Sequence, residues 1–166
     1  MKKLLIFSVF LTALLLYKVS FAAGSCFPMV HNSQLPAGTP EVTVIIGTDR
    51  QGSNSAVISK AVLNQLAAQK NVRINLVDLA KLPKSIFKSD YFAKKPAEFT
   101  KNFVDPIDQA SALVFVIPEY DGAVPGILSY FMNHVRVPLA EKQVALVGVS
   151  AGRWGARSAL DSFKGT

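Results

Sequence analysis

The sequence predicts an α/β fold with a doubly wound parallel sheet, and three observations lead to it. Four apolar runs have the length and composition of buried strands. Segments with apolar residues at helical spacing alternate with these runs. Polar loops with glycines follow three of the runs, at the strand ends where open α/β sheets bind ligands. With right-handed crossovers, we expect the strand order 2-1-3-4-5, of which this chain supplies the first four strands.

The predicted strands are short and mostly apolar: Val42–Ile46, Val72–Val77, Ala112–Ile117 and Gln143–Val149. The predicted helices lie within residues 56–66, 97–110, 127–132 and 154–163. We expect Pro106 to interrupt or restart the second helix, because proline suits a first helical turn and not an interior. Residues 78–95 are irregular, basic and contain Pro83, so they predict a long loop.

The predicted domain spans residues 41–166 and is C-terminally incomplete. The chain stops after the last predicted helix begins, where a five-stranded sheet needs another strand and a final helix. The fourth strand would then be an edge that needs cover from a partner chain. Residues 24–40 are rich in Gly, Pro, Ser and Asn and predict a linker.

The N-terminal residues 1–23 have the pattern of a signal peptide or membrane anchor. A basic start precedes a mostly apolar run from Leu4 to Tyr17, and small residues follow it. Cys26 is the only cysteine, so it is either an inert thiol or a site of lipid attachment. We therefore expect an exported protein that is either periplasmic or anchored to a membrane. If translation starts at Met29, we expect a cytoplasmic protein.

The composition fits a globular domain that binds a small molecule. Half of the 166 residues are hydrophobic, and 18 basic against 11 acidic residues give a net charge of +7. The basic residues are scattered without a stripe of interleaved aromatic residues, which argues against a nucleic-acid partner. Two histidines and one cysteine are too few for a typical transition-metal site, so no metal is predicted.

The first loop, residues 47–55, has the composition of a phosphate-binding loop. It joins a strand to a helix N-terminus and carries glycines, hydroxyls and Arg50. Amides at a helix N-terminus favour anions, and arginine can pair with a phosphate in bidentate fashion. A plain N-cap at Ser53 or Asn54 is the alternative. A nucleoside triphosphatase loop is excluded, because Ser53 and Asn54 stand where Lys and Ser/Thr are required.

The motif Gly148-Val-Ser-Ala-Gly152 admits a second chemistry. It matches the nucleophile elbow of serine hydrolases. Such an enzyme needs an acid and a histidine after the serine, yet the only histidines are His31 and His134, both before it. A turn with an N-cap at Ser150 is the plainer interpretation.

Together the loops favour a flat, phosphorylated, redox-active ligand. The loops after the first, third and fourth strands converge at one sheet edge in this strand order. The third strand leads into Pro118-Glu-Tyr-Asp-Gly-Ala-Val-Pro-Gly126, which combines fixed and flexible backbone with the ring of Tyr120. Flavin mononucleotide (FMN) has the required chemistry.

These three motifs, in this order and spacing, resemble the NADPH-dependent FMN reductases from about Val42 to the end of the chain. The resemblance implies a flavodoxin-like fold and noncovalent FMN. It implies two-electron reduction of quinones, azo compounds, free flavin or metal oxyanions with NADPH or NADH, and a homodimer with the flavin near the interface. A non-catalytic or degenerate flavin-binding fragment is an alternative.

The resemblance also implies the residues that contact FMN. Those for the phosphate are Thr48, Arg50, Ser53, Asn54 and Ser55. Those along the isoalloxazine are Pro118, Glu119, Tyr120, Asp121 and Gly122. Those closing its far side are Ser150, Ala151, Gly152 and Arg153. No residue is assigned a catalytic role, because the cofactor carries the hydride chemistry. Asp121 stands where the family usually has Asn, and an ionised carboxylate there would lower the flavin potential.

Overall fold

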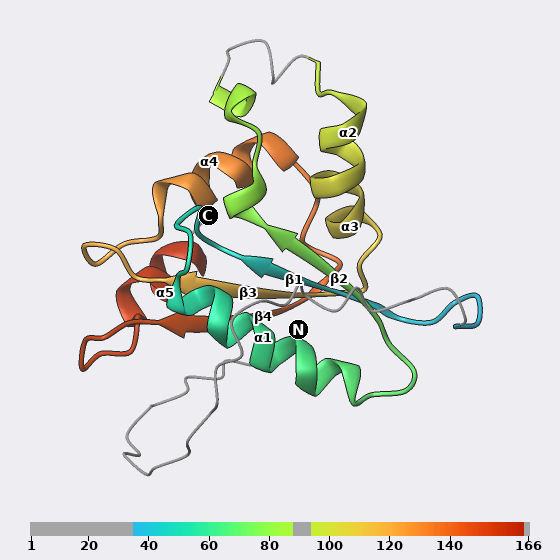
Figure 1. Ribbon diagram of the computed structural model, residues 1–166, viewed down its shortest axis with the longest axis horizontal. Coiled ribbons are helices and arrows are strands. Elements are labelled where there is room, and N and C mark those ends of the chain that lie inside the picture. Colours follow the sequence, from blue (N-terminus) through green and yellow to red (C-terminus); the bar gives the residue numbers. More distant parts are fainter. Residues whose placement is uncertain (1–34, 88–93, 165–166) are drawn as a thin grey trace.

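The computed structural model describes residues 35–87 and 94–164 (Figure 1). The predicted signal or anchor segment 1–23 and residues 24–34 of the predicted linker lie outside these ranges. The described residues form an α/β fold with a four-stranded sheet in the order β2-β1-β3-β4, and every pair of neighbouring strands is parallel. The predicted strand order is therefore confirmed for these four strands.

The strands begin and end close to their predicted bounds. They are β1 (Glu41–Ile46), β2 (Arg73–Asp78), β3 (Ala112–Pro118) and β4 (Gln143–Val149). The side chains of β3 from Phe115 to Pro118 are all buried, as expected for a strand covered on both faces. The apolar runs are good predictors here because a central parallel strand has no solvent-exposed side.

The main helices are α1 (Asn54–Ala67), α4 (Gly126–Val135) and α5 (Arg157–Lys164). The last helix starts later than predicted. Gly155 and Ala156 have positive φ angles of 59° and 62°, which are not helical, so a turn precedes the helix. No helix in residues 35–87 and 94–164 has both the length and the apolar character needed to cross a membrane.

The predicted helix in residues 97–110 is a composite of three turns. A short α2 (Ala97–Phe99) leads into a π-helical segment, η5 (Thr100–Val104), and then into α3 (Asp105–Asp108). The N–H of Asp105 bonds to the carbonyl of Thr100, five residues back. Pro106 has no N–H to continue the ordinary ladder, so the expected interruption takes the form of a wide turn.

The predicted loop 78–95 is more regular than expected in its described part. It contains the 3-10 turns η2 (Leu79–Lys81) and η3 (Lys84–Phe87). The carboxylate of Asp78 accepts the N–H of Ala80 at 3.1 Å and so starts the first turn. The buried side chains of Leu79 and Ile86 anchor both turns in the core. This is a tertiary effect that cannot be predicted from the local sequence.

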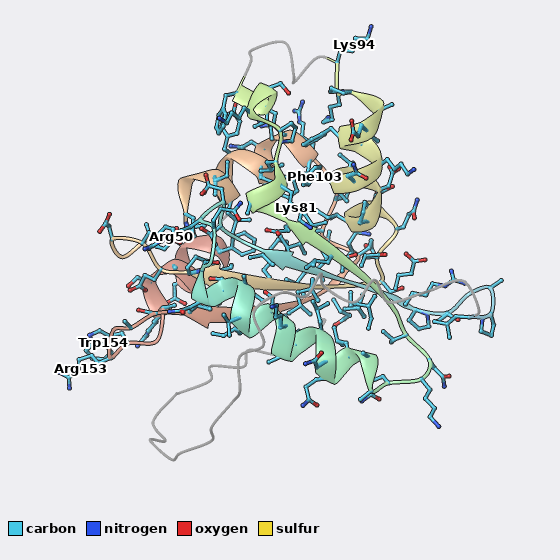
Figure 2. All side chains as sticks on the ribbon, in the orientation of Figure 1. Arg50, Lys81, Lys94, Phe103, Arg153 and Trp154 are labelled. Carbon is cyan, nitrogen blue, oxygen red and sulfur yellow. The ribbon has the colours of Figure 1, made fainter. Side chains whose placement is uncertain are left out.

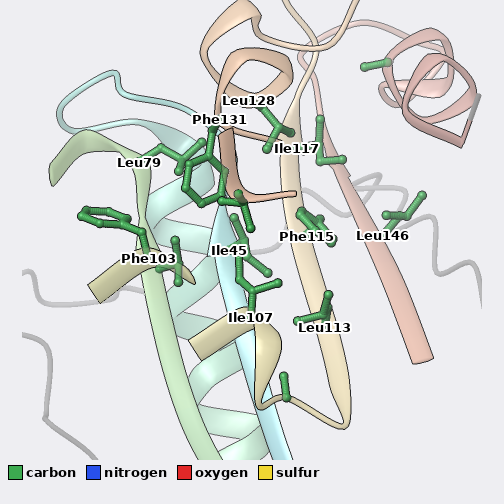
Figure 3. Packing of buried hydrophobic residues seen from close by; sticks show 14 of the residues in the cluster. Ile45, Leu79, Phe103, Ile107, Leu113, Phe115, Ile117, Leu128, Phe131 and Leu146 are labelled. Atoms are coloured by element: carbon green, nitrogen blue, oxygen red, sulfur yellow. The ribbon is translucent and has the colours of Figure 1, made fainter. Parts of the chain in front are cut away.

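Helices cover both faces of the sheet, with α1 on one side and α2, α3 and α4 on the other (Figure 1). Figure 3 shows the core on the α4 side, where side chains from β1, β3 and β4 meet Leu128 and Phe131. Helix α5 joins the same core, since the ring centroids of Phe163 and Phe115 lie 4.8 Å apart. The layers bury the central strands β1 and β3, and the loops lie at the carboxyl ends of the strands.

Candidate functional site

The loops after β1, β3 and β4 start side by side, because these strands are neighbours in the sheet. The N–H of Gly47 donates to the carbonyl of Val116 at 2.9 Å, and the N–H of Glu119 donates to the carbonyl of Val149 at 2.9 Å. Arg50, Arg153 and Trp154 lie on this side of the molecule in Figure 2. The structure therefore brings the three predicted loops to one edge.

Gly47 lets the first loop leave β1 without a clash. A Cβ on this glycine would lie 3.0 Å from Cδ2 of Leu128 and 3.1 Å from the carbonyl oxygen of Val116. The backbone of the loop therefore passes close over β3 and α4. Any side chain at position 47 would push the loop, and Thr48 with it, away from its neighbours.

Thr48 is almost fully buried, with 1% of its surface exposed. Its Oγ1 accepts the N–H of Arg50 at 3.2 Å and lies 2.9 Å from the phenol oxygen of Tyr120. The hydroxyl therefore shapes its own loop and joins it to the loop after β3. Arg50 itself is exposed, as an arginine that meets an incoming anion would be.

Ser53 caps helix α1, as the plain interpretation of the loop predicted. Its Oγ accepts the N–H of Ala56 at 3.2 Å, and its backbone is extended, as in an N-cap. Capping uses the hydroxyl oxygen as an acceptor and leaves its hydrogen able to donate. The cap and a phosphate contact are therefore compatible. Asn54 is exposed at the first position of α1.

Ser55 carries the strongest sign of a ligand at this helix N-terminus. Its side chain is 1% exposed, and its Oγ has no hydrogen-bond partner among the described residues. Buried polar groups are rarely left unsatisfied, because each costs about 1–3 kcal/mol. A phosphate oxygen above the first turn of α1 would supply the missing acceptor, so the donor set fits the phosphate of FMN.

The loop after β3 is a tight turn around Tyr120. Tyr120 and Ala123 exchange both backbone hydrogen bonds, at 3.1 and 3.0 Å, and form an isolated antiparallel bridge. The two residues between them, Asp121 and Gly122, have positive φ angles of 51° and 76°. This pair of left-handed residues is the pattern of a type I′ turn, which favours Asn, Asp and Gly. Pro118 is buried at the end of β3.

Glu119 has a structural contact that the sequence did not predict. Its Oε2 accepts the N–H of Ala159 in the first turn of α5 at 3.4 Å. A carboxylate at a helix N-terminus satisfies a free amide and interacts well with the helix dipole. Glu119 therefore links the loop after β3 to α5, and its side chain is directed to that helix.

The loop after β4 combines an internal hydrogen bond with exposed side chains. Ser150 Oγ accepts the N–H of Gly152 at 3.0 Å, and Ala151, Gly152 and Arg153 are exposed. The guanidinium of Arg153 lies 5.6 Å from the ring centroid of Trp154, a cation–π distance. Trp154 is 68% exposed. Both side chains reach outward in Figure 2, so this loop closes the site only at its backbone.

The hydrolase alternative finds no support in this geometry. His134 is fully buried in α4, and its Nδ1 lies 2.8 Å from the carbonyl oxygen of Tyr130. The hydroxyl of Ser150 contacts the amide of Gly152, so the part of the chain that the structure describes shows no serine–histidine pair. Gly148 serves packing instead, because a Cβ there would lie 2.9 Å from that of Ala156.

Three residues near the loops escaped the sequence analysis. Asp49, Phe87 and Tyr130 line a small pocket together with Tyr120. Phe87 lies in η3, within the segment predicted to be an irregular loop, and Tyr130 lies in a helix predicted only from its apolar spacing. The one available signal was an aromatic residue, Phe87, within the basic segment 78–95, because exposure and burial cannot be read from the sequence.

Comparison with known proteins gives consistent matches. The profile of the NADPH-dependent FMN reductase family matches residues 40–165. A quinone reductase from Pseudomonas putida is 32% identical over 119 residues, which are 69% of this chain and 62% of that protein. An NAD(P)H-dependent FMN reductase from Pseudomonas aeruginosa is 30% identical over 120 residues, covering 69% and 62% of the two chains. The matched part thus spans 62% of the length of these relatives.

A solved structure shows the same fold at the level of coordinates. The flavoenzyme NAD(P)H:(acceptor) oxidoreductase from Paracoccus denitrificans superposes with a TM-score of 0.61 at 26% identity. The alignment covers 76% of this chain and 69% of that one. The order of strands and the position of the three loops therefore belong to a fold already seen in a flavoenzyme.

Proposed function

The chain belongs to the NADPH-dependent FMN reductase family, and from this premise we propose that it binds FMN noncovalently and uses NADPH or NADH to reduce a small-molecule acceptor. When bound, FMN supplies two-electron hydride transfer between the nicotinamide and the acceptor. Quinones are the first acceptors to test, because a relative from Pseudomonas putida is named a quinone reductase. Azo compounds, free flavin and metal oxyanions are further candidates.

The observation that carries the proposal is the buried hydroxyl of Ser55 in the first turn of α1, which has no hydrogen-bond partner among residues 35–87 and 94–164. With the free amides of this helix, it offers donors where the phosphate of FMN would lie. Thr48, Arg50, Ser53 and Asn54 complete the proposed phosphate site. Thr48 would act by holding the loop in shape, since its hydroxyl already contacts Arg50 and Tyr120.

The loop after β3 is proposed to orient the isoalloxazine. Its tight turn fixes the positions of Tyr120, Asp121 and Gly122, and buried Pro118 anchors its start. A rigid loop positions a flat ring at little entropic cost, which is the main contribution a protein makes to hydride transfer. Glu119 would support this loop from behind through α5. Ser150, Ala151, Gly152 and Arg153 are proposed to border the far side.

The assembly and the cellular location are part of the same proposal. A homodimer would place the flavin near an interface, as the family resemblance implies. The N-terminal pattern supports export or membrane attachment, with lipid attachment at Cys26 or translation from Met29 as the alternatives. Size-exclusion chromatography and fractionation of the producing cells would test these two points separately.

The test is to purify the full chain, load it with FMN and measure both binding and turnover. We expect a yellow protein that releases FMN on denaturation and oxidises NADPH or NADH when a quinone is added. Protein that takes up no FMN contradicts the proposal. Protein that holds FMN but transfers no hydride to any of the acceptor classes would instead support the flavin-carrier alternative.

A further inference from the structure

A small cavity lies beside the proposed flavin loop, between the loop after β1 and the start of α4. Its volume is about 320 Å³, and its lining includes Asp49, Phe87, Tyr120 and Tyr130. Gly126 and Ile127, the first residues of α4, also line it. Of these residues, only Tyr120 is among the expected FMN contacts. We refer to this cavity as the aromatic pocket.

Hydrogen bonds of their phenol groups hold two of its aromatic side chains, Tyr120 and Tyr130, in place. Tyr130 Oη donates to the carbonyl oxygen of Ile86 at 3.1 Å, and the phenol of Tyr120 lies 2.9 Å from Oγ1 of Thr48. The rings of Phe87 and Tyr130 have centroids 5.0 Å apart, at an interplanar angle of 33°. Fixed rings present a flat apolar surface, against which a planar ligand can stack.

Phe87 is the residue that most needs an explanation. It is 61% exposed, although η3 is anchored by the fully buried Ile86 next to it. An exposed phenylalanine gains little for folding, because most of its apolar surface stays in water. The ring would lose this exposure if a flat ligand filled the pocket and covered it.

The polar groups of the pocket limit the charge of the ligand. Asp49 is the only charged residue among the described residues of the lining, and no described cation lies within salt-bridge distance of it. A carboxylate at the rim disfavours an anion. No side chain of the described residues caps α4, and the amides of Gly126 and Ile127, in the first turn, have no acceptor within the helix, so they can donate to an uncharged carbonyl oxygen.

We propose that the aromatic pocket binds a flat aromatic carbonyl compound without negative charge, and that Asp49 is the specificity residue that rejects anionic analogues. Its use as the acceptor site of the reductase rests on the proposed function. In that role it would favour uncharged quinone-type acceptors over metal oxyanions and sulfonated dyes. The binding preference itself does not depend on flavin.

The test uses two probes with the same ring system, 2-acetylnaphthalene and 6-acetylnaphthalene-2-sulfonate. Both are titrated by calorimetry into the full chain, with and without FMN and always without NAD(P)H. We expect the uncharged ketone to bind about five-fold or more tightly than the sulfonate, the size of an exposed charge effect. Asp49→Asn should bring the two affinities to within about two-fold.

Two further variants separate the charge effect from a general disturbance. Phe87→Ser should weaken both probes about equally, by roughly three-fold or more, because it removes the stacking surface. Asp161→Asn removes an exposed carboxylate from α5, outside the pocket lining, and should leave the ratio between the probes unchanged. Thermal melts of each variant check that the fold is kept.

Equal affinity of the wild type for both probes, or an unchanged ratio in Asp49→Asn, would overturn the proposal. The outcome is separable from that of the proposed function. If the protein binds FMN and oxidises NAD(P)H but shows no preference between the probes, the proposed function is supported and the pocket proposal is wrong. If the protein takes up no FMN but discriminates between the probes, the proposed function is wrong and the pocket proposal is supported.

Discussion

The hydroxyl of Thr48 and the phenol of Tyr120 lie 2.9 Å apart, and this contact joins the loop after β1 to the loop after β3. Thr48 is almost fully buried, whereas Tyr120 is partly exposed at the sheet edge. The contact therefore connects the interior of the proposed phosphate loop to the surface that would face the flavin ring. It is a direct side-chain link between two of the three loops.

Removing either partner should weaken FMN binding. A hydrogen bond of this kind contributes about 0.5–1.5 kcal/mol, so Tyr120→Phe and Thr48→Val should each raise the Kd for FMN by roughly two- to ten-fold. The double variant should bind FMN about as weakly as Thr48→Val alone, because both single changes remove the contact between Thr48 and Tyr120, and only Thr48→Val also removes the acceptor for the N–H of Arg50. Flavin fluorescence titration measures all three constants. Fully additive losses would show that the two residues act independently.

Ser55 and Ser59 form a matched pair on α1. Both hydroxyls are buried and lack a hydrogen-bond partner among the described residues. Alanine at either position should leave the FMN-free protein equally stable or about 1 kcal/mol more stable, because an unsatisfied group is removed. Only Ser55→Ala should also raise the Kd for FMN, by about ten-fold, since this hydroxyl lies in the first turn. Equal FMN affinity in both variants would place the phosphate elsewhere.

Gly148 should not tolerate a side chain. An added Cβ would lie 2.9 Å from Cβ of Ala156 and 3.0 Å from Cδ1 of Leu160, so α5 would have to move away from β4. Gly148→Ala should cost about 1–3 kcal/mol in the free energy of unfolding, the usual cost of overpacking. Gly126→Ala is the control, because no atom of the described part of the chain lies within 4 Å of its added Cβ. Urea unfolding should show a loss for position 148 alone.

Asp121 tests the electrostatics of the proposed flavin loop. Its φ angle of 51° is one that asparagine also adopts readily, so Asp121→Asn keeps the turn and removes the charge. We expect the two-electron potential of bound FMN to rise by about 20 mV, the equivalent of roughly 1 kcal/mol for an exposed charge. Redox titration of the two FMN-loaded proteins measures this shift. Identical potentials would show that the carboxylate does not affect the flavin.

Asp161 should titrate below its ordinary value. A hydrogen bond from Lys164, whose Nζ lies 2.9 Å away, lowers the pKa of this carboxyl, and the charge of Lys164 adds to the effect. The pKa of Asp161 is lower in the folded protein than in the unfolded chain, where it is about 3.9. The charged carboxylate therefore stabilises the folded state at pH values above the unfolded pKa, and this stabilisation is lost as the pH falls through the folded pKa. NMR titration should give a midpoint that rises in Lys164→Met. An unchanged midpoint would contradict this cause.

The sequence predicts the sheet well because its signal is physical and local. The two central strands, β1 and β3, bury most of their side chains, so apolar runs such as Ala112–Ile117 mark these strands directly. The helical segments are harder where backbone bonding departs from the ordinary ladder. The π turn before Pro106 depends on which carbonyl an amide reaches, and no residue type specifies that choice.

The site is predictable to the level of its loops but not of its side-chain contacts. Gly52 and Gly122 mark the turns because a positive φ selects glycine. The contact of Glu119 with the amide of Ala159 joins residues far apart in the chain, and only the packing of α5 brings them together. The role of Phe87 could not be predicted for the same reason, because its ring contacts Tyr130 of α4, which is far away in the sequence.

The central position of β1 has a kinetic consequence. Glu41 pairs with Arg73, but Val42 also pairs with Ala112, and β3 pairs in turn with β4. Parallel pairs of such wide separation close late in folding, because the long loops must be ordered first. The three binding loops therefore come together only when β4 has docked on β3. A ligand that contacts all three cannot stabilise a half-assembled chain, so its uptake would report the moment at which β1, β3 and β4 are all paired.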